Sequence, residues 1–335
     1  MLQTNRNQEE RKDVPRLLTR GEQIDEYIIS GLISIGGFGQ VYTGFHRTNH
    51  TRVAIKVESS TASIPLLRNE AACLHFLNSR HNPYGEESRE PILRYITYGK
   101  NDNLKYLIMD HCGANLRELK RATSEDKFSM TTSLWIMERM MSALQFIHSH
   151  GWLHRYFINT DGSYKERKPT SPFHGTVRYA SLNTHNRQDQ CRWDDLWSVF
   201  YITIENMVGA LPWRHISDKK KVAEMKTSCD FHDLEYGNET CMPRPLRMLA
   251  YHLYDAYREQ ESSFYATPPY SRIIREVEHE LNQRHFYQNS PLDWELKQSQ
   301  YTILSNYDHH NHDEKALPME QPLFEYSGKR SYYCF

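Results

Sequence analysis

The sequence contains few cysteines, and their spacing argues against two classes of protein. Six occur among 335 residues, and no two of them form a C-x-x-C pair. Disulfide-rich secreted domains carry far more cysteine for their length, and structural zinc sites need closely spaced ligand pairs. We therefore expect no disulfide framework and no metal site, and an intracellular location in the cytoplasm, the nucleus or both.

Long apolar runs and an excess of one charge are also missing. The longest apolar region, residues 196–213, is interrupted by Ser198, Thr203, Glu205 and Asn206, so we do not expect it to span a bilayer. Lys and Arg together number 41 and Asp and Glu 42, which gives a formal net charge of −1. Bulk attraction to nucleic acid or to an anionic membrane is therefore not expected, and neither is predicted as a partner.

The apolar content is nevertheless high enough for a folded core, since 39% of the residues are hydrophobic and 12% are aromatic. Residues 1–20 are polar and charged, and they predict a disordered tail without a secretory signal. Runs of β-branched and aromatic residues at 27–33, 40–46 and 52–57 are separated by turn residues. They predict an antiparallel meander.

The rest of the chain is mostly helical in pattern. Apolar residues recur at helical spacing over 64–77, and two short strands are expected at 93–98 and 105–109. After residue 113 the sequence predicts helices at 116–121, 131–150, 194–208, 218–226, 245–257 and 270–284. A small β-rich part followed by a larger helical part is typical of an α+β, two-lobed protein.

A glycine-rich turn lies between the first two predicted strands. It reads Ser34-Ile-Gly-Gly-Phe-Gly39 and is followed by Val41, while the third strand carries Val53-Ala-Ile-Lys56. Glycines let the backbone approach a phosphate closely, and a lysine on the neighbouring strand can reach phosphate oxygens. The alternatives are an ordinary turn and a solvated lysine, but the order of the parts favours a nucleotide site.

Glu70 follows Lys56 by fourteen positions and lies in the middle of the first predicted helix. If the two side chains pair, the carboxylate holds the lysine toward nucleotide. The alternative is a surface carboxylate, which is the commonest fate of glutamate. The spacing favours the pair.

With these residues the chain resembles a eukaryotic protein kinase, and later motifs resemble the casein kinase 1 superfamily. That group carries a Ser-(Ile/Val/Leu)-Asn sequence, present here at 181–183, where most kinases have Ala-Pro-Glu. Residues 291–295, Pro-Leu-Asp-Trp-Glu, resemble the end of the domain in the tau-tubulin kinase branch. Three further stretches extend the likeness: 194–198, 211–214 and 218–222.

The resemblance covers about residues 21–295. It implies a bilobal kinase fold with an N-lobe at 21–111, a C-lobe at 112–295 and a C-terminal tail at 296–335. The implied activity is transfer of the ATP γ-phosphate to serine or threonine of a protein substrate. The nucleotide-binding residues that it implies are Ile33, Ser34, Gly36, Gly37, Phe38, Gly39, Val41, Ala54, Lys56, Glu70, Met109 and Asp110.

The family's catalytic loop is where the sequence departs from the resemblance. A working kinase has the signature H-R-D-x-x-x-x-N and then D-F-G, which supply the general base and the magnesium ligands. Here His154-Arg155 is followed by Tyr156, and no D-F-G occurs before Gly175. A whole block is missing rather than one residue. Asp161 falls near the position of the metal-binding Asn, but Asp161-Gly162 is first of all a turn dipeptide.

These absences predict a catalytically impaired or inactive pseudokinase that acts by binding or scaffolding, with no catalytic residue. ATP binding is expected to be weak, and magnesium is expected only if the missing segment exists. One alternative is an active Ser/Thr kinase whose sequence here lacks an exon, because family sequence resumes cleanly on both sides of the gap. Another is a truncated chain that does not fold stably.

A second surface is implied by the family's recognition of acidic or phosphorylated substrates. Thr176 and Arg178 match that part of the motif, and an arginine can grip phosphate with two parallel hydrogen bonds. The lysines at 219–221 are a looser match. For them a solvated helix start is the favoured interpretation. The expected protein partner is acidic or phosphorylated.

Overall fold

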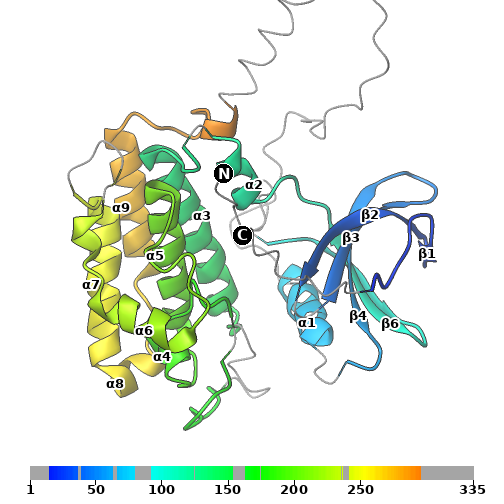
Figure 1. Ribbon diagram of the computed structural model, residues 1–335, viewed down its shortest axis with the longest axis horizontal. Coiled ribbons are helices and arrows are strands. Elements are labelled where there is room, and N and C mark those ends of the chain that lie inside the picture. Colours follow the sequence, from blue (N-terminus) through cyan, green and yellow to red (C-terminus); the bar gives the residue numbers. More distant parts are fainter. Residues whose placement is uncertain are drawn as a thin grey trace, which may run out of the picture. The chain divides into compact units, whose positions relative to one another are not determined.

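The computed structural model describes residues 15–36, 39–62, 66–79, 92–123, 125–153, 163–173, 175–234, 236 and 241–295. The chain divides into two compact units (Figure 1). The first is built from the described residues between 15 and 79 together with 93–112, and the second from residue 92 and the described residues from 113 onward. Of the expected tails, residues 1–14 and 296–335 lie outside the described part.

The first unit contains one six-stranded antiparallel sheet with the order β1-β2-β3-β4-β6-β5. The β-branched and aromatic runs predicted as strands form its centre, where such side chains pack well on a pleated surface. One helix, α1 (Leu66–Asn78), follows β4. The strands are β1 (Gln23–Ile24), β2 (Tyr27–Gly36), β3 (Gly39–His46), β4 (Arg52–Ser59), β5 (Tyr95–Lys100) and β6 (Leu104–Asp110).

Strand β4 is buried on both faces of the sheet. Its alternate residues Val53, Ile55 and Val57 join one apolar cluster, whereas Ala54 joins a second cluster with side chains of α1. Because successive side chains of a strand point to opposite faces, Lys56 shares the α1 face with Ala54. The alternation of β4 therefore places a lysine beneath a helix.

The expected tail over residues 1–20 does not extend as far as residue 20. Leu18 is 2% exposed and belongs to the same apolar cluster as Tyr42. Its backbone N–H donates to the Tyr42 hydroxyl at 3.1 Å, and the N–H of Leu17 donates to Gln40 Oε1 at 2.9 Å. The polar composition of residues 1–20 gave no sign that Leu17 and Leu18 contact β3.

Among the described residues of the glycine-rich turn, 34–36 and 39, Gly39 is the one whose backbone strictly requires glycine. Its φ is +138°, and a Cβ there would lie 2.4 Å from the carbonyl oxygen of Val57. We expect Gly39→Ala to destabilise the first unit by about 1–3 kcal/mol. Hydrogen exchange of β3 and β4 amides measures the loss. Gly36→Ala is the matched control, since its Cβ would meet nothing nearer than 3.7 Å; equal effects of the two changes would contradict the argument.

The second unit is a bundle of helices around α5 (Arg192–Val208), which packs against α3 (Met130–Ser149) and α7 (Arg244–Arg258) (Figure 1). Helix α9 (Tyr270–Gln283) packs on α3 and α7. Most α5 side chains are buried, which explains why that stretch is apolar nearly all round. The shorter helices are α2 (Leu116–Arg121), α4 (Leu182–His185), α6 (Lys219–Ser228) and α8 (Gln260–Phe264).

Side-chain caps fix where several of these helices begin. The Asn115 side chain accepts from the N–H of Glu118, and the Ser129, Ser181 and Asp218 side chains each accept from an N–H three residues further on. Such caps satisfy donors that a helix start leaves unpaired. None of the described helices is long and apolar enough to cross a membrane.

Candidate functional site

The predicted pair of Lys56 and Glu70 is present in the first unit. Lys56 Nζ lies 2.5 Å from Glu70 Oε2, between β4 and α1. Both side chains are partly exposed, so the ammonium is oriented by the carboxylate without being removed from solvent. A lysine held in this way can offer its charge to a phosphate.

The other predicted nucleotide-binding residues of the described chain lie on neighbouring strands of the same sheet. In the sheet register Val41 of β3 lies opposite Lys56, and Ala54 of β4 lies opposite Met109 of β6. Ile33, Ser34 and Gly36 are on β2, Gly39 is on β3 and Asp110 is on β6. Gly37 and Phe38 lie outside the described residues.

Two observations indicate that these residues are suited to a purine nucleotide. Val41, Ala54 and Met109 belong to one apolar cluster, while Ile33 of β2 keeps 50% of its surface exposed although it is a large apolar side chain. Apolar surface with one oriented cation is what adenine and a phosphate chain require together. For a metal, no group of three or more His, Cys, Asp or Glu side chains comes together within the described ranges.

The part of the sequence where the catalytic loop is expected lies outside the described residues. It includes His154, Arg155, Tyr156 and Asp161. Just before them, His148 near the end of α3 is buried and makes two hydrogen bonds. Its Nε2 lies 2.9 Å from Asp195 Oδ2 of α5, and its Nδ1 contacts the Tyr270 hydroxyl of α9. The His148 side chain therefore connects the end of α3 with the first turns of α5 and α9.

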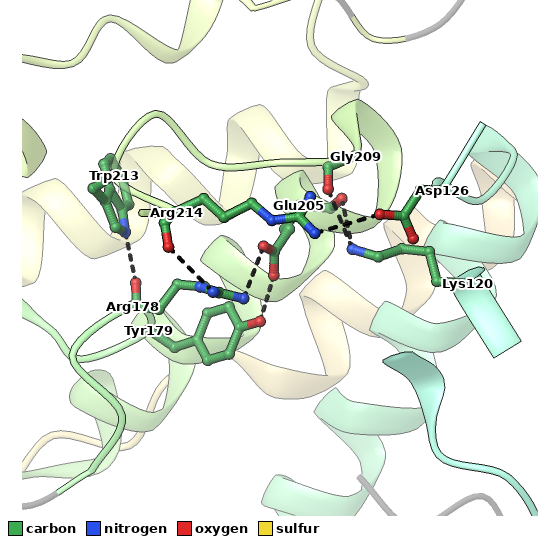
Figure 2. Close-up of polar contacts among 8 residues, drawn as sticks. All are labelled: Lys120, Asp126, Arg178, Tyr179, Glu205, Gly209, Trp213 and Arg214. Carbon is green, nitrogen blue, oxygen red and sulfur yellow. Dashed lines mark hydrogen bonds and ion pairs between the residues drawn. The ribbon is translucent and has the colours of Figure 1, made fainter. Parts of the chain in front are cut away.

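In the second unit, Arg178 and Tyr179 are gathered around Glu205 of α5 (Figure 2). Arg178 Nη1 lies 3.3 Å from Glu205 Oε1, and its Nη2 donates to the carbonyl of Arg214 at 3.3 Å. The Tyr179 hydroxyl donates to the other Glu205 oxygen. Burial, together with this carboxylate, raises the pKa of Tyr179 to about 12. The carboxylate of Glu205 thus has two polar partners in a buried position.

A second cation, Lys120, lies at the carboxyl end of α5 and donates to its last backbone carbonyls. Lys120 of α2 is buried and directs its Nζ at the carbonyls of Glu205 and Gly209, at 3.5 and 3.4 Å (Figure 2). A cation is favourable there because the last carbonyls of a helix carry partial negative charge. Beside it, Arg214 Nη2 lies 3.4 Å from Asp126 Oδ2.

This arrangement bears on the expected anion surface. Thr176 is exposed, but the Arg178 side chain is only 26% exposed and already pairs with Glu205. The anion-binding role of Thr176 and Arg178 remains a prediction. The lysines at 219–221 are exposed at the start of α6, as expected for a solvated helix start.

Sequence reasoning missed the partners that matter most here. Glu205 lies within an apolar helix, and Lys226 follows the buried Val222 by one helical turn. Both positions could have indicated a buried polar partner, because a charged residue on the buried face of a helix needs one. Both were passed over because charged side chains usually lie at the surface.

Comparison with known proteins agrees with this geometry. Residues 27–156 match the protein kinase domain family. The chain is 34% identical over 230 residues to a probable serine/threonine-protein kinase of Dictyostelium discoideum, covering 60% of this chain and 45% of that protein. The serine/threonine-protein kinase spe-6 of Caenorhabditis elegans is 23% identical over 291 residues, covering 78% of this chain and 73% of spe-6.

A probable casein kinase I homolog of Encephalitozoon cuniculi is 26% identical over 301 residues, covering 79% of this chain and 92% of the homolog. The chain thus spans less than half of the Dictyostelium protein and most of the other two relatives. The expected two-lobed α+β fold of the protein kinase type is confirmed. Over residues 27–156 the chain is therefore similar to the protein kinase domain family, and the relatives that it matches include serine/threonine-protein kinases.

Proposed function

We propose that this chain is a kinase-like binding module of the casein kinase 1 superfamily, closest to the tau-tubulin kinase branch, with greatly impaired phosphotransfer. The observation that carries the proposal is Tyr156 directly after His154-Arg155, with no D-F-G before Gly175. The match to the kinase domain family also ends at residue 156, where the catalytic loop would continue. The module would act by holding an acidic or phosphorylated protein partner.

The size of the expected impairment follows from what the missing block supplies. A positioned general base contributes a factor of about 10² to 10⁴ in rate. Magnesium ions neutralise the charge that develops on the transferred phosphoryl group, and their ligands lie in the same block. Loss of both leaves positioning by Lys56 and Glu70 as the remaining contribution, so the rate falls below a useful level.

Nucleotide binding is a separate part of the proposal. Lys56, oriented by Glu70, would contact phosphate oxygens, and Val41, Ala54 and Met109 would contact the adenine. ATP would therefore bind weakly and without magnesium. Magnesium enters only if the missing segment exists, because the Asp and Asn that hold it belong to that segment.

The test is a phosphotransfer assay on the full chain, with ATP, magnesium and casein or a tubulin peptide. We expect no phosphate incorporation above that of a Lys56→Met variant, together with a small thermal stabilisation by ATP that magnesium does not change and Lys56→Met abolishes. A chain with a segment that supplies the missing Asp, Asn and D-F-G, inserted between Arg155 and Tyr156, serves as the positive control. Magnesium-dependent incorporation by the unmodified chain that Lys56→Met removes would refute the proposal.

A second candidate is an ordinary Ser/Thr kinase whose sequence here lacks an exon. It is favoured by the clean resumption of family motifs at Gly175-Thr-Val-Arg178 after the gap. Sequencing of the native transcript across the codons of Arg155 and Tyr156, with tryptic peptides over that junction, separates the two candidates. An insert that encodes H-R-D and D-F-G supports the active enzyme, and a confirmed junction supports the binding module.

A further inference from the structure

Four successive backbone carbonyls, those of residues 177–180, accept hydrogen bonds from side chains of other elements. Lys226 Nζ of α6 donates to the carbonyls of Val177 at 2.9 Å and Ala180 at 2.6 Å. Between them, the Arg178 carbonyl accepts from Trp213 Nε1 at 2.8 Å and the Tyr179 carbonyl from Ser198 Oγ at 3.1 Å. An irregular segment thus has its carbonyls satisfied as fully as those of a strand.

Lys226 provides two of these four bonds from a buried position. The residue is 2% exposed, and its Nζ also lies 3.2 Å from His185 Nε2 of α4. The ammonium faces the rings of Tyr201 and Trp213, with the nitrogen 4.7 and 5.3 Å from the ring centroids. Carbonyl dipoles and aromatic faces both stabilise a cation. The Nζ atom therefore has three polar neighbours and two aromatic rings around it.

We propose that Lys226 is the positioning residue of the segment 176–180, which carries Thr176 and Arg178, and that it holds this segment in one conformation without any phosphate group. In many kinases an activation loop becomes ordered when a phosphate on it pairs with arginine. Here the buried Lys226 side chain performs that ordering through its hydrogen bonds to two carbonyls of the segment. The inference deepens the proposed function, because this segment is the surface expected to meet a protein partner.

Proton linkage gives the Lys226 side chain a pH-dependent signature that an apolar side chain in its place would lack. Burial lowers the pKa of Lys226 from 10.5 to about 7. An unfolded or locally opened lysine then binds more protons than the closed one between pH 7 and 10.5, so closure becomes more favourable as pH rises above about 7. Below pH 7 both states are protonated, and the gain is absent.

Two other ionisable groups that lie against Lys226 keep one charge state between pH 6 and 9. Burial lowers the pKa of His185 on α4 to about 4, so its ring stays neutral. Burial raises the pKa of Tyr201 on α5 well above its ordinary value, so its hydroxyl also stays neutral. In the segment itself, Arg178 remains paired with Glu205. A pH dependence of this segment that vanishes without Lys226 therefore reports on Lys226.

The experiment is amide hydrogen exchange on the full chain, without nucleotide or partner, at pH 6 and pH 9 after correction for intrinsic exchange. The probes are the N–H groups of Tyr179 and Ala180, which donate to the Thr176 carbonyl. We expect Lys226→Met to raise their exchange by more than tenfold and leave α7 and α9 unchanged. Lys220→Met, the same substitution at an exposed position of α6, is the matched control and should change nothing.

Unchanged protection of Tyr179 and Ala180 in Lys226→Met would overturn the proposal. If that variant unfolds throughout, Lys226→Gln decides: it must lower the protection of both amides relative to the wild-type chain, and unchanged protection would overturn the proposal. Lys226→Gln, which keeps a donor but no charge, should show intermediate protection without the pH dependence. Because neither ATP nor phosphotransfer is measured, failure here leaves the proposed function standing, and failure of the phosphotransfer test leaves this result standing.

Discussion

Glu205→Ala is expected to lower the free energy of unfolding of the second unit by about 3–5 kcal/mol, the range for removing one partner of a buried ion pair. The Glu205 carboxylate is the acceptor for both the Arg178 guanidinium and the Tyr179 hydroxyl. Without it, Arg178 keeps its charge in a partly buried position and Tyr179 loses its partner. The backbone carbonyl of Glu205, which accepts from Lys120, is not altered by the substitution.

Tryptophan fluorescence in urea measures this loss selectively. All six tryptophans of the sequence, the first of them Trp135, lie after residue 113, so their emission reports on the second unit alone. Arg178→Met and the double variant complete a thermodynamic cycle, in which a coupling above about 1 kcal/mol assigns the loss to the pair. Glu205→Gln keeps the shape and removes the charge. A loss below about 1 kcal/mol for Glu205→Ala would contradict the account.

Trp213→Ala is expected to destabilise the same unit by about 3–5 kcal/mol, as for other buried aromatic residues. Trp213 is buried and meets the Tyr201 ring edge-on, with centroids 5.4 Å apart. It also faces Phe231, and its Nε1–H holds the carbonyl of Arg178. Removal of the indole therefore leaves a cavity and an unpaired carbonyl at once.

Trp213→Phe separates the two contributions. It retains the larger part of the aromatic surface but removes the Nε1–H donor and a few ring atoms, so we expect a loss of about 1–2 kcal/mol. The five remaining tryptophans report the urea transition for both variants. Equal losses for the alanine and phenylalanine variants would contradict the packing argument, because the hydrogen bond would then account for the whole effect.

The long elements could be predicted from the sequence because their patterns repeat. The predicted 131–150, 194–208 and 270–284 end within two residues of α3, α5 and α9 as observed. Strand β1 and helix α4 were missed, since two and four residues cannot establish a period. The pair of Lys56 and Glu70 could be predicted because kinase motifs come in a fixed order.

The surroundings of Arg178 could not be predicted in the same way. Its place in the motif was clear, but its partner Glu205 is 27 residues further along the chain. Lys226 was included in a helix expected to begin with solvated lysines, and only tertiary packing separates it from the exposed Lys220. Periodicity identifies a helical face but not which segment covers it.

The direction of the bonds to residues 177–180 also has a consequence for biosynthesis. The three donor side chains, Ser198, Trp213 and Lys226, all follow the segment along the chain. Proteins emerge from the ribosome amino end first. The segment therefore emerges from the ribosome before its three donors do, and it cannot take up its final conformation until residue 226 has also emerged.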